Sequence, residues 1–83
     1  MDYIEEDDRI LVRLDPGDYV LESLETVREE CEVTGGFFAG IGAVDEVTLG
    51  HYDVGTEDYK EETKTGQFEV TSFLGNIGPD KIH

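Results

Sequence analysis

The side chains that most often bind metals or act as nucleophiles are few and widely separated in this sequence. The histidines are His51 and His83, and Cys31 is the only cysteine. A zinc site takes three or four such ligands, with short characteristic spacings along the chain. No such spacing occurs here, and His51 stands in an otherwise apolar strand segment, which favours a histidine packed for structural reasons. We therefore expect no metal site formed by this chain alone, and no cofactor.

The glycines of Gly40-Ile41-Gly42 and the abundant carboxylates raise two further chemistries. A dinucleotide-binding loop needs its glycines between a strand and a following helix, whereas here the helical pattern precedes them, so tight packing in a sheet explains them better. A glycosidase pair needs one carboxyl group in an apolar pocket. Glu46 and Glu69 are the only carboxylates deep in strand segments, and both fall on faces suited to solvent. Since no serine lies in a nucleophile elbow and no base flanks Cys31, we predict that the protein is not an enzyme.

One helix and about five strands must position these residues. The helix is predicted from Asp15-Pro16-Gly17-Asp18, where an aspartate caps the chain and Pro16 suits a first helical position, to about Glu32. Its apolar residues recur at helical spacing and are Val20, Leu21, Leu24, Val27 and Cys31. Alternating apolar and polar residues predict strands over residues 9–14, 36–44, 46–54, 59–65 and 68–75. This pattern is typical of an α+β domain.

The net charge is the strongest feature of the composition. Twenty-one Asp and Glu stand against six Lys and Arg, which gives −15, whereas about 2–8 charges suffice for a small soluble domain. Disorder and adaptation to high salt both produce such a charge. Because the predicted strands stay apolar and glycine-rich, we favour a folded protein of a halophilic prokaryote such as an archaeon. Residues 1–8 carry five acidic side chains and are predicted to form a solvated arm before the domain.

The same composition limits the partners. Affinity for duplex DNA comes largely from Lys and Arg, and no basic stripe is visible, so the charge disfavours direct DNA binding. No apolar run approaches the roughly 20 residues that cross a bilayer. The acidic start lacks the features of a secretory leader, and a single cysteine fits a reducing compartment. We expect a cytoplasmic protein that does not associate with membranes.

Four segments, in this order, resemble the plants and prokaryotes conserved (PPC) domain family. They are Arg13–Asp18, the glycine-rich stretch Gly35–Asp53, Gly66–Val70 and Leu74–Ile77. The resemblance covers residues 9–83. It implies a twisted, mostly antiparallel sheet with one helix, assembly as a homotrimer, and an association with DNA that plant members owe to adjoining AT-hook segments. The sequence ends where the family's next strand continues, so we expect a domain that is incomplete at its C-terminus.

The resemblance also implies which residues matter. Prokaryotic relatives carry a His-x-His run after the Asn-Ile-Gly turn that can hold zinc, and His83 matches its first histidine; a zinc site shared between subunits is therefore the alternative to no metal. The expected function is an oligomerising, DNA-associated regulatory or interaction domain. One alternative is a small-molecule or metal-binding protein, enzymes included, with a site between subunits near His83, Asn76 and His51; the other is an inactive, truncated remnant. The residues expected in the core of the oligomer are Gly36, Phe37, Phe38, Gly40, Ile41, Gly42, Leu49, Gly50, Phe68, Gly75 and Asn76.

Overall fold

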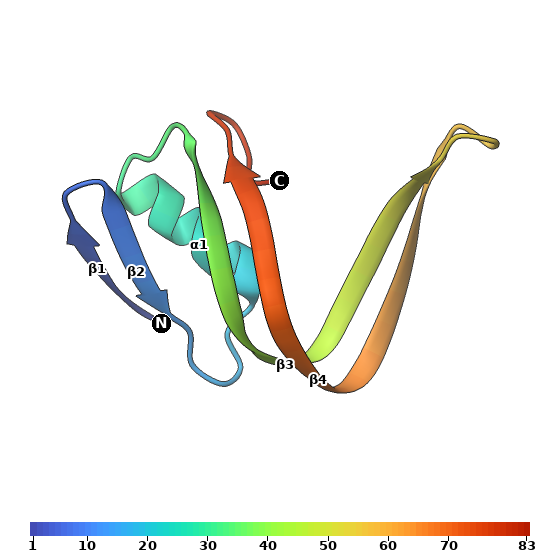
Figure 1. The fold of residues 1–83 in the computed structure, drawn as a ribbon, viewed down its shortest axis with the longest axis horizontal. Coiled ribbons are helices and arrows are strands. Elements are labelled where there is room, and N and C mark those ends of the chain that lie inside the picture. The colour runs from blue at the N-terminus through green and yellow to red at the C-terminus, as the bar shows by residue number, and fades with distance from the viewer. The chain divides into compact units, whose positions relative to one another are not determined.

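The computed structural model describes all residues from Met1 to His83 and confirms an α+β fold with one helix (Figure 1). The expectation of about five strands in one twisted sheet is wrong, because four strands form two separate two-stranded sheets. The chain divides into two compact units, Met1–Phe38 with Leu74–His83 (unit 1) and Ala39–Phe73 (unit 2). The elements, in chain order, are β1 Asp2–Glu6, β2 Arg9–Arg13, α1 Val20–Glu30, β3 Gly36–Asp53 and β4 Asp58–Ile77.

The N-terminal residues, expected in a solvated arm, form an ordered hairpin in unit 1. Strand β1 pairs antiparallel with β2, and Glu6 lies opposite Arg9, so that only two residues make the turn. Asp7 adopts a φ of 47° there, a conformation that aspartate tolerates better than most side chains. The partner strand β2 was predicted from its alternating apolar residues. Strand β1 was not predicted, because its acidic residues are typical of a solvated segment.

Helix α1 is shorter than predicted at both ends. It begins after Tyr19, whose side chain makes no capping hydrogen bond. The two aspartates expected to cap it instead close the preceding loop, since Asp18 Oδ2 accepts a hydrogen bond from the Asp15 N–H (2.8 Å) and the Asp18 N–H donates to the Asp15 carbonyl (3.0 Å). The helix ends at Glu30 rather than near Glu32, and Glu32 takes a φ of 55°, which is incompatible with continuing an α-helix.

The glycine-rich stretch and the polar stretch after it form two long antiparallel neighbours rather than four short strands. Strand β3 runs without a break through the predicted gap at residue 45, and β4 runs through Gly66. Gly66 holds a φ of 153°, which a residue without a Cβ adopts without strain. In the turn between the strands, the Asp53 carboxylate accepts hydrogen bonds from the N–H groups of Gly55 and Thr56 at 2.9 and 3.2 Å.

The chain after β4 turns back along this strand within unit 1. Asn76 and His83 exchange two backbone hydrogen bonds, at 2.6 and 2.7 Å, and the Gly78 N–H donates to the Lys81 carbonyl at 2.9 Å. Ile77 and Ile82 form an antiparallel bridge. The chain therefore turns between Gly78 and Lys81, and residues 81–83 begin a pairing with the edge of β4.

The hydrophobic core of the single chain is small. Val27 on α1, with 5% of its surface exposed, is the one buried hydrophobic residue. The predicted helix stripe is therefore only partly buried; its Leu21 is 56% exposed. Phe38 covers Gly75 in unit 1, and Phe73 lies against Gly40 in unit 2, where a Cβ would meet its Cδ1 atom at 3.8 Å. A chain this short buries a limited share of its apolar surface, and this fold leaves most large apolar side chains in contact with solvent.

Candidate functional site

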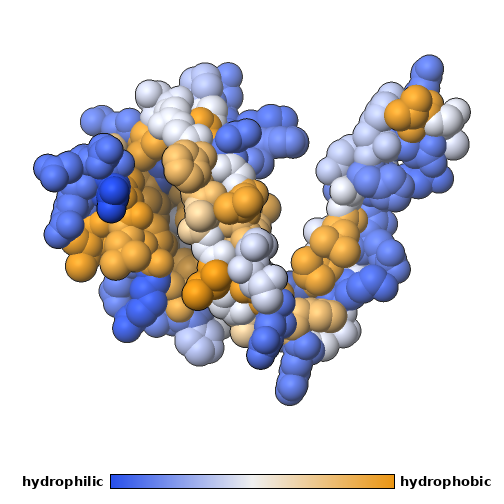
Figure 2. Space-filling view, in the orientation of Figure 1, coloured by the Kyte–Doolittle hydropathy of each residue, from blue (hydrophilic) through white to orange (hydrophobic).

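Large apolar side chains gather on the surface of unit 1, in both of its strand pairs. Ile4 and Leu11 lie directly opposite each other in the β1–β2 hairpin, and both are exposed. On the long strands, Phe37 is 79% exposed and Leu74 is also exposed, while the neighbouring Phe38 is half-buried. Figure 2 shows apolar side chains spread over the visible surface of this unit. Exposed apolar surface of this kind is a common feature of sites where proteins contact other molecules.

Unit 2 repeats this feature along its hairpin. Ile41 is 85% exposed, and Leu49 and Tyr52 are exposed as well. The ring of Tyr59 covers Gly50, where an added Cβ would meet the Tyr59 hydroxyl oxygen at 2.7 Å. Hence Gly50 provides the space for an aromatic side chain of the facing strand.

The residues predicted for the oligomer core divide between the two units. Several of them pair a glycine with an aromatic ring: Gly75 with Phe38 and Gly40 with Phe73, while Phe68 packs against Gly66. Nothing lies within 4 Å of the Cβ position at Gly36 or Gly42. The predicted set comprises Gly36, Phe37, Phe38, Gly75 and Asn76 in unit 1, and Gly40, Ile41, Gly42, Leu49, Gly50 and Phe68 in unit 2.

The candidate metal ligands do not form a cluster. No group of three or more His, Cys, Asp or Glu side chains lies close enough together to hold a metal ion. His83 and Asn76 form the backbone pair at the end of unit 1. His51 belongs to unit 2, where it lines a recess of about 570 Å³ with Leu49, Gly50, Lys60, Glu61 and Glu62.

A polar cluster joins the β1–β2 hairpin to the end of α1. The Tyr3 hydroxyl donates a hydrogen bond to Glu30 Oε2 at 2.6 Å, and this bond to a carboxylate raises the pKa of Tyr3 to about 12. Burial, reinforced by Glu5, raises the pKa of the Cys31 thiol above its usual value. Because only the thiolate is a good nucleophile, Cys31 is poorly suited to catalysis. No local sequence pattern indicates this cluster, since Tyr3 and Glu30 lie 27 residues apart in the chain.

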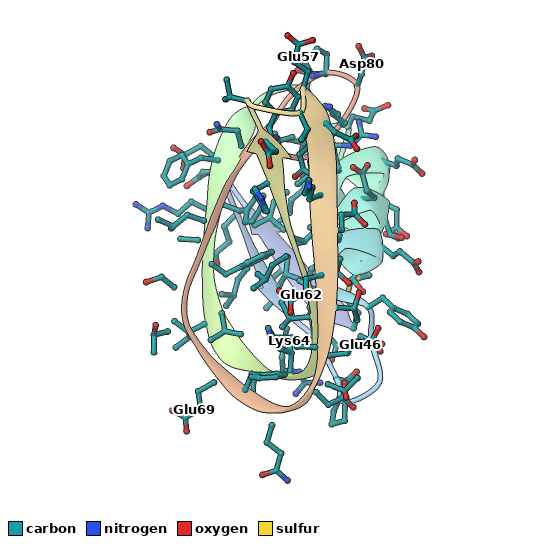
Figure 3. All side chains as sticks on the ribbon, turned by 90° about the vertical axis from the view of Figure 1, so that its right-hand side faces the viewer. Glu46, Glu57, Glu62, Lys64, Glu69 and Asp80 are labelled. Atoms are coloured by element: carbon teal, nitrogen blue, oxygen red, sulfur yellow. The ribbon has the colours of Figure 1, made fainter.

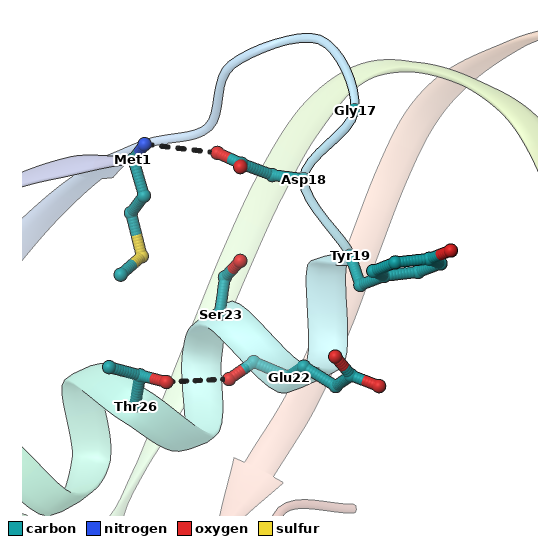
Figure 4. Close-up of a pocket in the computed structure, with 7 residues that line it drawn as sticks. All are labelled: Met1, Gly17, Asp18, Tyr19, Glu22, Ser23 and Thr26. Carbon is teal, nitrogen blue, oxygen red and sulfur yellow. Dashed lines mark hydrogen bonds and ion pairs between the residues drawn. The ribbon is translucent and has the colours of Figure 1, made fainter.

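A second unpredicted cluster surrounds the N-terminal amino group. The Met1 ammonium lies 2.7 Å from Asp15 Oδ2 and 3.0 Å from Asp18 Oδ2, and these hydrogen bonds raise its pKa. Figure 4 shows the pocket beside it, about 290 Å³ in volume, which the start of α1 and the preceding loop enclose. Its lining residues are Met1, Gly17, Asp18, Tyr19, Glu22, Ser23 and Thr26.

The carboxylates considered for acid–base chemistry lie on the outside. Glu46 and Glu69 are exposed, and Figure 3 shows Glu69 pointing away from the ribbon. Neither lies in an apolar pocket of the kind that surrounds a catalytic acid. Helix α1 has 11 residues, and the structure contains no helix with the length and apolar character that crossing a membrane requires.

The comparison with protein families gives one match, and it extends over the entire chain. The Plants and Prokaryotes Conserved (PCC) domain family matches residues 1–83, so the matched region includes the β1–β2 hairpin as well as the glycine-rich strands. The comparisons with curated proteins and with solved structures found no match. The motifs around α1, the glycine–aromatic packing of β3 and β4 and the full-length match agree, and this chain is a member of the Plants and Prokaryotes Conserved domain family.

Proposed function

We propose that this domain is a non-enzymatic assembly module that forms a homotrimer and serves DNA-associated regulation through protein partners. The observation that carries the proposal is the contrast between one buried hydrophobic residue, Val27, and strongly exposed side chains such as Phe37 and Ile41. Each buried CH₂ group contributes about 0.8 kcal/mol. Covering these side chains with another subunit therefore supplies the stabilisation that a small domain with a thin core lacks.

Electrostatics favour assembly at high salt. Copies of a chain with a net charge of −15 repel one another, and the screening length falls from about 10 Å at 0.1 M salt to about 3 Å at 1 M. The proposed source is accordingly a halophilic prokaryote, with the protein working in the cytoplasm. The same charge opposes direct contact with DNA phosphates, which is why the proposed route to DNA runs through a partner protein.

Sedimentation equilibrium in 2–3 M KCl, about the ionic strength at which surface charges are fully screened, tests the assembly. The expected mass is three times that of the 9.3 kDa chain. Phe37→Asp should lower this mass, because it places a charge on the exposed apolar face, whereas Thr34→Asp adds the same charge in the loop before β3 and should not. A monomer in wild-type protein at molar salt would contradict the proposal.

The salt and DNA components have their own tests. Dilution into 0.1 M salt should cause loss of the oligomer and of circular dichroism signal, and a chain that stays fully folded there would remove the argument for a halophilic source. Fluorescence anisotropy with labelled duplex DNA, recorded at the lowest salt concentration at which circular dichroism shows a folded chain, should show no binding by the isolated domain, since phosphate contacts weaken as the salt concentration rises.

A small-molecule function is the second candidate, and the recess around His51 favours it. This recess contains a histidine, a lysine and two glutamates, His51, Lys60, Glu61 and Glu62, which suits a polar ligand better than an apolar one. Histidine chemical shifts in NMR spectra, recorded during titration with zinc or with a library of small polar metabolites, test this candidate. Shifts at His51 that saturate would favour ligand binding over a purely structural role, and shifts at His83 with zinc would favour the shared metal site.

A further inference from the structure

The side chains of two residues on α1 reach the turn that follows β4. Glu25 Oε1 accepts a hydrogen bond from the Ile82 N–H at 3.2 Å, and Arg28 Nη1 donates one to the Pro79 carbonyl at 3.4 Å. Both contacts lie within unit 1. They join residues that are 57 and 51 positions apart in the sequence, so the helix holds the turn at both of its ends.

The same two side chains also fix each other. Arg28 Nε donates to Glu25 Oε2 at 2.8 Å, across one turn of the helix. The Arg28 side chain is only 15% exposed and that of Glu25 is 35% exposed, so this pair is better shielded from solvent than an ordinary surface ion pair. Each carboxylate oxygen of Glu25 thus has its own donor. The hydrogen bond from Arg28 holds the pKa of Glu25 below its usual value.

The segment held in this way covers one edge of β4 at its last two residues, Asn76 and Ile77. Asn76 N–H and C=O are both paired with His83, and Gly78 N–H is paired with Lys81. Unpaired groups at a strand edge are a template for pairing with another chain, and proteins protect such edges with covering segments. The bridge between residues 79–83 and β4 joins one residue pair, Ile77 and Ile82, so the side-chain contacts from α1 add to a limited backbone pairing.

We infer that Glu25 and Arg28 form a latch that keeps residues 79–83 on the C-terminal end of the β4 edge and thereby closes this end to strand pairing with a second copy of the chain. Opening the latch frees the backbone N–H and C=O of Asn76. Leu74, two residues earlier on β4, is 72% exposed, and this apolar surface makes a second copy of the chain the expected partner. The latch is a feature of one chain and does not depend on the proposed trimer.

Amide hydrogen exchange tests the latch directly. Glu25→Ala removes the acceptor of the Ile82 N–H, and a hydrogen bond to a charged group is strong enough that exchange at Ile82 and His83 should become about tenfold faster or more. Glu25→Gln keeps an oxygen acceptor but loses the charge, so its effect should be intermediate. Glu29→Ala is the matched control, because Glu29 follows Arg28 directly, is 73% exposed and approaches Arg28 only at 4.0 Å; exchange at Ile82 should not change there.

Light scattering at fixed protein and salt concentrations tests the consequence for the edge. Glu25→Ala should form species larger than the wild-type particle, whatever the mass of that particle is, whereas Glu29→Ala should not. Unchanged exchange at Ile82 in Glu25→Ala would refute the latch, and faster exchange without larger species would refute the closing of the edge. If Glu25→Ala loses its circular dichroism signal, Glu25→Gln provides both readouts. A monomeric wild type would overturn the proposed trimer while leaving the latch to be decided by exchange.

Discussion

Replacing Gly75 by alanine should destabilise the domain strongly, because the Cβ position at Gly75 is already occupied. An added Cβ there would overlap the ring of Phe38 and lie 2.7 Å from the backbone carbonyl oxygen of His83. A ring can move at moderate cost, but His83 is fixed by its backbone pair with Asn76, and moving it opens that pair.

Overpacking of this kind costs about 1–3 kcal/mol. In a domain of this size, each 1 kcal/mol shifts the thermal midpoint by about 4–8 °C, so the midpoint should fall by several degrees at least. Gly40→Ala is the matched control on β3. The nearest atom to a Cβ at Gly40 is Phe73 Cδ1 at 3.8 Å, an ordinary contact, and a tolerated Gly→Ala change stabilises by about 0.4–1 kcal/mol through the unfolded state.

Thermal unfolding followed by circular dichroism, at equal protein and salt concentrations, measures the difference between the two variants. Gly75→Ala should melt clearly below the wild type, and Gly40→Ala at or slightly above it. Equal midpoints for the two alanine variants would show that Phe38 and His83 do not pack around Gly75 as described, and would refute the reasoning.

Three further predictions concern single side chains. Val27→Ala should cost about 2 kcal/mol, since it removes buried methyl groups and leaves a cavity, whereas Leu21→Ala, at a 56% exposed position, should cost much less; urea unfolding measures both. Alkylation of Cys31 should be slow at pH 8, and Glu5→Gln should accelerate it, because burial and Glu5 raise the thiol pKa; a pH–rate profile with iodoacetamide checks this. The pKa of Glu25 is lower in the folded chain than its unfolded value of about 4.5, so the ionised carboxylate stabilises the fold above that pH. This stabilisation is lost as the pH falls through the folded pKa. The difference in unfolding free energy between wild type and Glu25→Gln should therefore shrink below pH 4.5.

Much of the secondary structure could be predicted from local sequence. The spacing of Val20, Leu24 and Val27 indicated the helix, and alternation indicated β2 and most of β3 and β4. Helix and strand periods depend on residues that are close in sequence, so the amino-acid sequence of one protein is enough to predict these elements. The family could also be predicted, because the order of its motifs survives in the residues themselves, and the full-length match confirmed it.

The parts that failed depend on residues far apart in the chain. The acidic stretch from Asp2 to Glu6 became a strand because β2 lies opposite it, and the predicted gap at residue 45 disappeared because β3 and β4 support each other on both sides of it. The bonds from Glu25 to Ile82, from Arg28 to Pro79 and from Tyr3 to Glu30 were likewise not predicted, since no local pattern marks a partner more than 20 residues away.

Sequence alone determined the acidic composition, the helix and the glycine–aromatic alternation of this protein, because each is a property of neighbouring residues. Only the tertiary structure decided which apolar residues a single chain can bury. Phe37 and Phe38 have the same side chain and adjacent positions, yet opposite faces of one strand leave Phe37 exposed and place Phe38 over Gly75. The physical reason is that burial depends on what packs against each face, and that is set by the path of the whole chain.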